Sequence, residues 1–201
     1  MELLVIGKPN TGKTLLLLNL AQYLGMREIC IDVGDLDGAL KTKRISLDRA
    51  RRDLVSLYTP KTTQLQTMTW EMAIGRQRNA LVVTDSPGIL EGIHPDADYR
   101  RQLALTLERA TRVMAVFHVV DASATGTRRP EAPGTFDVAL AEWAASQPGY
   151  LLVANKVDKP GGLEGLRLLR ERFPGTPLVP ASAVTRRGFR ELKGWIVRVL
   201  G

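Results

Sequence analysis

The chain has 201 residues, 44% of them hydrophobic and 24% charged, which is typical of a globular domain with a full core. No apolar run approaches the roughly 18–20 residues of a transmembrane helix. The single cysteine, Cys30, excludes an internal disulfide, so we expect a cytoplasmic protein. The N-terminus lacks a basic segment followed by an apolar stretch and a cleavage site, so we expect no signal peptide. The net charge of +7 favours an anionic partner such as RNA, the ribosome or an acidic membrane, with a merely solvated basic surface as the alternative.

Short apolar strands alternate with helices along most of the chain. The predicted strands are 2–6, 27–33, 67–74, 80–85, 113–123, 150–156 and 177–182. The predicted helices are 13–24, 98–110, 134–147, 163–173 and 187–200. This alternation predicts an α/β fold, a three-layer αβα sandwich with a mostly parallel sheet.

One antiparallel hairpin interrupts the parallel pattern. Residues 67–74 alternate, with Met68, Trp70 and Met72 on the face that we expect to be buried. The polar stretch 75–79 then turns the chain back into an apolar strand.

The stretch "GKPNTGKT" lies between the first predicted strand and the first predicted helix and fits the pattern G-x-x-x-x-G-K-[ST]. Glycines let the backbone turn so that successive N–H groups face phosphate oxygens, and the positive end of the next helix adds to the attraction. Lys13 is placed to reach terminal phosphates, and Thr14 to put its hydroxyl on Mg²⁺. The alternative is a glycine-rich turn without a ligand. The predicted residues of this loop are Gly7, Pro9, Asn10, Thr11, Gly12, Lys13 and Thr14.

A second polar group follows the buried strand "ALVV". Asp85 stands at the carboxyl end of that strand, where open α/β sheets bind ligands. Its carboxylate can hold Mg²⁺ through water, and Gly88 can offer its N–H to a terminal phosphate. By itself "DSPG" is an ordinary turn; together with the phosphate loop it predicts a metal and phosphate site.

The stretch "NKVD" directly follows the strand "YLLVA". Asp158 can accept hydrogen bonds from the ring N–H and the amino group of guanine, a pair that adenine lacks. Asn155 can tie this loop to the phosphate loop, and the stem of Lys156 can cover the ring. On the last short strand, the small residues Ser182 and Ala183 can bring a backbone N–H to the base oxygen.

Taken in order and spacing, "GKPNTGKT", "DSPG", "NKVD" and "SA" resemble the P-loop GTPases of the translation-factor class, most closely the small Era-like and TrmE-like bacterial proteins. The resemblance implies a single G domain over residues 1–201, a P-loop NTPase fold, binding of GTP and GDP with Mg²⁺, and a switch between the two states. It also implies catalytic roles for Lys13, Thr63 and Gly88, and metal ligation by Thr14, Thr63 and Asp85. The RNA-binding module that Era itself carries is not expected here.

Two features set the expected rate of hydrolysis. Ile89 follows Gly88 where many switch GTPases carry a glutamine that orients water, so we expect slow intrinsic hydrolysis. Asn10 matches a position that helps to bind K⁺ in the resembling family, which implies K⁺ stimulation; stabilising the turn is the alternative role. The switch threonine is assigned to Thr63, with Thr62 as the alternative.

A segment at about 27–58 is longer than in compact family members and is rich in basic residues, Arg51 and Arg52 among them. Within it, residues 40–54 suggest an amphipathic basic helix that touches RNA or lipid, an effector-binding segment, or a solvated face. The sequence alone leaves two other functions open. One is a P-loop ATPase or small-molecule kinase, in which "NKVD" is accidental, and the other is a nucleotide-binding scaffold without turnover.

Overall fold

The computed structural model describes residues 1–34, 40–55, 65–74, 77–92, 94–144 and 147–200. The strands are β1 (Glu2–Ile6), β2 (Glu28–Gly34), β3 (Leu40–Ser46), β4 (Gln66–Ile74), β5 (Gln77–Asp85), β6 (Ala115–Asp121), β7 (Tyr150–Asn155) and β8 (Leu178–Pro180). The helices are α1 (Lys13–Tyr23), α2 (Leu47–Leu54), α3 (Ala97–Ala110), α4 (Ala122–Thr127), α5 (Thr135–Ala144), α6 (Gly162–Arg172) and α7 (Phe189–Leu200).

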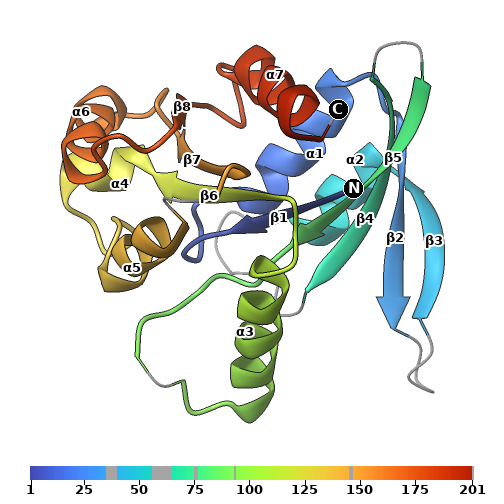
Figure 1. The fold of residues 1–201 in the computed structure, drawn as a ribbon, viewed down its shortest axis with the longest axis horizontal. Coiled ribbons are helices and arrows are strands. Elements are labelled where there is room, and N and C mark those ends of the chain that lie inside the picture. Colours follow the sequence, from blue (N-terminus) through green and yellow to red (C-terminus); the bar gives the residue numbers. More distant parts are fainter. Residues whose placement is uncertain (35–39, 56–64, 75–76, 93, 145–146, 201) are drawn as a thin grey trace.

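All eight strands form one sheet in the order β3-β2-β4-β5-β1-β6-β7-β8 (Figure 1). The half from β5 to β8 is parallel, and the half from β3 to β5 is antiparallel. The αβα architecture predicted from the alternation of elements is confirmed. Because β1 lies in the middle of the sheet, the loop that leaves it reaches ligands from the centre of the carboxyl edge.

Two apolar layers cover the sheet, one on each face. Helices α1, α2 and α7 pack on one face, where Leu16, Phe117 and Trp195 belong to a single buried cluster. Helices α5 and α6 cover the other face around Tyr150 and Leu169, and α3 adds Leu103 at its margin. No helix among the described residues is long and apolar enough to cross a bilayer.

The predicted hairpin is formed by β4 and β5, which pair antiparallel from Gln66 with Asp85 to Ile74 with Gln77. Met68 and Trp70 are fully buried and Met72 is almost so, which confirms the face assigned to them. This long pairing fixes the register of β5 and thereby places Asp85 at the carboxyl edge beside β1.

The basic segment folds as a second hairpin and a short helix. Strands β2 and β3 pair along their whole length, and α2 follows β3 directly. The alternative of one amphipathic helix over residues 40–54 is therefore wrong, because Leu40–Ser46 is a strand and only Leu47–Leu54 is helical. Ser46 ends the strand and caps α2, because its side chain accepts a hydrogen bond from the Arg49 amide. The insertion thus widens the sheet and adds a helix beside α1.

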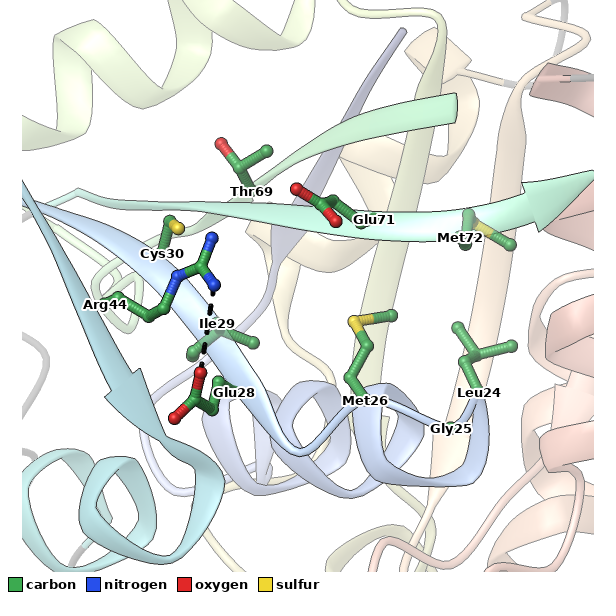
Figure 2. A pocket seen from close by; sticks show the side chains of 10 residues that line it. All are labelled: Leu24, Gly25, Met26, Glu28, Ile29, Cys30, Arg44, Thr69, Glu71 and Met72. Atoms are coloured by element: carbon green, nitrogen blue, oxygen red, sulfur yellow. Dashed lines mark ion pairs between the residues drawn. The ribbon is translucent and has the colours of Figure 1, made fainter. Parts of the chain in front are cut away.

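A pocket of about 340 Å³ opens where strand β2 of the insertion meets β4 of the remaining sheet. Strand β2 pairs with β4 only at Cys30 with Thr69 and at Ile31 with Met68, so the two strands diverge beyond this point. Figure 2 shows Met26 facing the gap from the turn after α1. None of the lining residues belongs to the predicted nucleotide site.

Candidate nucleotide site

The phosphate loop has the backbone that its glycines predict. Asn10 and Gly12 adopt φ values of 61° and 90°, so the loop turns through left-handed conformations before α1 begins. A Cβ on Gly7 would lie 2.2 Å from the Val119 carbonyl oxygen, and one on Gly12 would lie 2.6 Å from the Asn155 side-chain nitrogen. The loop is therefore packed against two neighbouring strand ends, and only glycine fits at these two points.

Lys13 lies beneath this loop and is 6% exposed. Its ammonium group donates to the carbonyl oxygens of Gly7 at 3.1 Å and Lys8 at 2.9 Å. Burial lowers the pKa of Lys13 to about 8, although Asp85 acts in the opposite direction. A buried ammonium group held only by two backbone carbonyl oxygens is suited to pair with an anionic ligand such as a phosphate.

Asp85 and Thr14 meet at the edge of the loop. The Thr14 hydroxyl donates to Asp85 Oδ2 at 2.5 Å. Asp85 Oδ1 is buried and has no hydrogen-bond partner among the described residues. Burial raises the pKa of Asp85 to about 6, against the effects of Lys13 and Thr14. A hydroxyl oxygen beside a carboxylate oxygen that lacks a partner is a donor set that fits a hard divalent cation such as Mg²⁺.

Gly88 lies against the phosphate loop, because a Cβ on it would come within 2.5 Å of Pro9 Cα. The Tyr99 hydroxyl donates to the Gly88 carbonyl oxygen at 2.5 Å and accepts from the Leu90 amide at 2.9 Å. Helix α3, which carries Tyr99, thus holds the segment after Asp85 in place. The contact between the Gly88 amide and a terminal phosphate stays a prediction.

Asn155 joins three loops. Its side-chain nitrogen donates to the Thr11 carbonyl oxygen at 2.8 Å, and its side-chain oxygen accepts from the Ala183 amide at 3.0 Å. The tie to the phosphate loop expected from the sequence is confirmed. The Ser182 amide also donates within the protein, to the Arg187 carbonyl oxygen. The use of the Ser182 and Ala183 amides toward a base oxygen stays a prediction.

Lys156 has a φ of 63° and turns its side chain back toward the phosphate loop. Its ammonium group donates to Asp121 Oδ2 at 2.6 Å and to the Asn10 carbonyl oxygen at 2.5 Å. Asp158 follows in the same loop with an exposed side chain, so its carboxylate is accessible to a ligand. The structure therefore brings "NKVD" and the phosphate loop into direct contact.

Ile89 is 2% exposed and packs in the cluster on the α5 and α6 face. Its amide donates to the Gly7 carbonyl oxygen at 3.1 Å. The side chain therefore points into the core. The predicted switch threonine, Thr63 or Thr62, lies outside the described residues.

Sequence reasoning missed three supporting residues: Asp121, Asn19 and Tyr99. Asp121 stands at the carboxyl end of a fully buried strand, and the rule that identified Asp85 from its place at a strand end also identifies Asp121. Asn19 donates to the Ala183 carbonyl oxygen at 2.7 Å from the middle of α1, and Tyr99 acts from α3. These two contacts depend on helix packing, which leaves no local motif in the sequence.

Residues 2–156 match the model of the family described as 50S ribosome-binding GTPase. The chain belongs to this GTPase family. Its relatives include the GTPase Obg of Bacillus velezensis, 37% identical over 117 residues, which are 56% of this chain and 27% of that protein. The GTPase Obg of Syntrophobacter fumaroxidans is 32% identical over 182 residues, 86% of this chain and 50% of that protein. The chain thus spans between a quarter and a half of these curated relatives.

Solved structures show the same fold. Era in complex with MgGDPNP and nucleotides 1506–1542 of 16S ribosomal RNA superposes with a TM-score of 0.65 at 19% identity, covering 98% of this chain and 56% of that one. The G domain of the T. maritima FeoB iron transporter has a TM-score of 0.56 at 18% identity, covering 100% and 99%. The family and the fold agree with the P-loop GTPase resemblance seen in the sequence.

Proposed function

We propose that this chain binds GTP and GDP with Mg²⁺ and hydrolyses GTP to GDP and phosphate, acting as a molecular switch. One observation carries the proposal: Asn155, from "NKVD", holds the phosphate loop and the Ala183 loop together in a single hydrogen-bonded unit. These two bonds hold "NKVD" beside the phosphate loop, as a role of this motif in binding the base of the same nucleotide requires. Family membership supports the same conclusion.

In this proposal Thr14 and Asp85 hold Mg²⁺ together with Thr63, or with Thr62 in its place. The ion neutralises charge on the phosphate oxygens when bound. Lys13 exchanges its two carbonyl partners for terminal phosphate oxygens, and the Gly88 amide donates to the terminal phosphate. The protein thus contributes mainly positioning and charge stabilisation.

Guanine selection is assigned to Asp158, which accepts from the ring N–H and the amino group of the base. The Asp158→Asn variant should lose GTP affinity and gain affinity for xanthosine triphosphate, because the new amide donates where xanthine offers an oxygen. Equilibrium competition among guanine, xanthine and adenine nucleotides measures this exchange. Preference for ATP in the unaltered protein would favour the ATPase or small-molecule kinase instead.

Slow hydrolysis follows from Ile89, whose buried side chain cannot orient water. K⁺ is proposed to raise the rate through Asn10. The φ of 61° also gives Asn10 a role in the turn that needs no ion. Asn10→Gly separates the two roles, because glycine keeps this backbone conformation and removes only the side chain. We expect faster hydrolysis in KCl than in NaCl, and loss of this difference in Asn10→Gly; equal rates in both salts would exclude the K⁺ role.

The proposed macromolecular partner is RNA, within a ribosome or free, encountered in the cytoplasm. The family description names ribosome binding, and the Era structure contains ribosomal RNA. The alternative of a scaffold without turnover predicts binding but no product. Single-turnover hydrolysis with excess protein and Mg²⁺ distinguishes it from the switch, since one round of phosphate release is enough to exclude the scaffold.

A further inference from the structure

The cations of the insertion are largely matched by its own acids. Arg51 pairs with Asp48 at 2.8 Å and Arg49 with Asp53 at 3.3 Å, both within α2. The Arg51 side chain is also committed to α1, where it donates to the side-chain oxygens of Asn19 at 2.8 Å and Gln22 at 2.7 Å. Because these positive charges are paired with nearby carboxylates, the segment should attract a polyanion only weakly.

The C-terminal helix has the opposite balance. Residues 184–201 contain five basic side chains and a single acidic one, Glu191. The basic side chains, all exposed, are Arg186, Arg187, Arg190, Lys193 and Arg198. Glu191 makes a long pair with Arg190 at 3.4 Å, and the Arg190 side chain is 87% exposed. These five residues, which we term the α7 basic face, hold most of the chain's excess positive charge.

The helical period separates this face from the core. Phe189, Leu192, Trp195 and Ile196 are buried against the sheet. The exposed arc between Arg190 and Arg198 contains Gly194, whose Cβ position meets no atom within 4 Å. The face is therefore charged, and at Gly194 no side chain projects between Arg190 and Arg198.

We propose that the α7 basic face binds the phosphate backbone of double-stranded RNA. The inference rests on the RNA partner proposed above and names the surface that contacts it. A bilayer is disfavoured because interfacial helices insert large apolar side chains, and those of α7 are used in the core. Single-stranded RNA is disfavoured because it stacks on exposed aromatic rings, and both aromatic rings of α7 itself, Phe189 and Trp195, are buried.

The position of the face links it to the guanine site. Arg186 and Arg187 lie in the loop that begins at Ser182 and Ala183, and the Arg187 carbonyl oxygen accepts from the Ser182 amide at 3.1 Å. Helix α7 lies beside α1, as the edge contact between Tyr23 and Phe189 shows, with ring centroids 5.7 Å apart (Figure 1). RNA bound on α7 would therefore lie next to the nucleotide without covering the phosphate loop.

The test uses fluorescence anisotropy with the full chain, saturated with GDP, and a labelled RNA duplex at several KCl concentrations. The double variant Arg190→Glu/Lys193→Glu is compared with Arg49→Glu/Arg52→Glu, which changes the net charge equally on the same side of the sheet. We expect the α7 variant to lose on the order of tenfold or more in affinity and to lower the salt slope by about two. The α2 variant should change much less, and Glu191→Gln should bind more tightly.

Three outcomes would overturn the proposal: no duplex binding by the unaltered chain, equal losses in the two variants, or a larger loss in the α2 variant. Binding to phosphatidylserine vesicles in place of RNA would overturn it as well. GDP affinity, measured on every variant, shows whether each one is folded. Because the RNA assay needs no turnover, its failure leaves the hydrolysis proposal standing, and a failure of hydrolysis leaves this surface standing.

Discussion

The Thr14 hydroxyl donates to Asp85 Oδ2 at 2.5 Å, while the other oxygen of the same carboxylate is buried with no partner among the described residues. Two residues that are far apart in the sequence thus meet as the pair of oxygen ligands that we propose for Mg²⁺. The arrangement places a carboxylate in a low-dielectric position next to Lys13, where its ionisation has a cost. This cost determines how protein stability and Mg²⁺ affinity should change with pH.

Asp85→Asn should abolish Mg²⁺-dependent hydrolysis, yet keep or raise the stability of the nucleotide-free protein at pH 7.5. Since burial raises the pKa of Asp85 to about 6, the folded state binds a proton more tightly than the unfolded state. The contribution of Asp85 to folding stability is therefore least favourable above pH 6. It improves as the pH falls from there toward the ordinary pKa of an aspartate. Thermal unfolding at pH 7.5 and 5 measures this, and Asp85→Asn should remove the part of the pH dependence that Asp85 contributes.

Magnesium should show the opposite pH dependence. The ion needs the carboxylate, so Mg²⁺ affinity of the GDP complex should weaken as pH falls through about 6. Titration of Mg²⁺ at two pH values checks the direction. An affinity that does not change with pH would mean that Asp85 does not hold the ion.

Asn155→Ala should weaken GTP and GDP binding by roughly tenfold or more, because it breaks two buried hydrogen bonds that join the phosphate loop to the Ala183 loop. Asn155→Asp is the matched comparison, since a carboxylate can still accept from the Ala183 amide but cannot donate to Thr11. Nucleotide affinity by calorimetry should fall in both variants. Unchanged affinity in Asn155→Asp would show that the Thr11 bond is dispensable.

The sequence was most informative where a local pattern determines the structure. The alternation around Trp70 predicted β4 and its buried face, and the glycines at 7 and 12 predicted the tight approach of the phosphate loop. Position at a strand end predicted Asp85 and Asn155, because parallel strands bring their carboxyl ends to one edge. These features depend on neighbours in sequence or on the regularity of the sheet.

The structure of the insertion and the supporting residues of the site were harder to predict from the sequence. A strand and a helix meet at Ser46 within one basic stretch, and only the cap followed by Asp48 in the first turn signals the boundary. One partner of His118 is Asp137, which comes from α5, a helix that no local pattern places opposite β6. Such contacts follow from tertiary packing alone.

His118→Phe should destabilise the fold by about 2–4 kcal/mol without slowing hydrolysis per folded molecule. The ring is fully buried, with its nitrogens 2.8 Å from the Tyr150 hydroxyl and 2.8 Å from Asp137 Oδ1. Burial opposes ionisation of Asp137, but hydrogen bonds from His118 and the Gly134 amide keep its pKa below the ordinary value. Removing the ring leaves that carboxylate buried with one partner fewer. Tyr150→Phe, which removes only the hydroxyl that contacts His118, should cost about 1 kcal/mol. Chemical denaturation measures the stability of both variants.

Gly88→Ala should sharply reduce GTP hydrolysis, because the added Cβ would meet the Pro9 backbone at 2.5 Å and separate the two loops. Gly194→Ala is the control, since the same change on α7 meets no atom within 4 Å. In a helix interior this control should raise stability by about 0.5–1 kcal/mol and leave the rate unchanged. Similar rates in the two variants would show that close packing at Gly88 is not needed for turnover.

Ile89→Gln tests whether the slow rate reflects only a missing glutamine. The Ile89 side chain is 2% exposed and its amide donates to Gly7, so the backbone directs this position into the core. A glutamine here would bury an amide without evident partners and should cost about 1–3 kcal/mol of stability.

We expect no acceleration of single-turnover hydrolysis in Ile89→Gln, in KCl or in NaCl. Ile89→Leu, which keeps an apolar side chain of the same volume, is the control for packing and should lose less stability. A marked rise in rate for the glutamine variant would show that the segment after Asp85 rearranges on nucleotide binding and brings position 89 to the terminal phosphate. In that case the identity of this side chain, rather than its burial, would set the intrinsic rate.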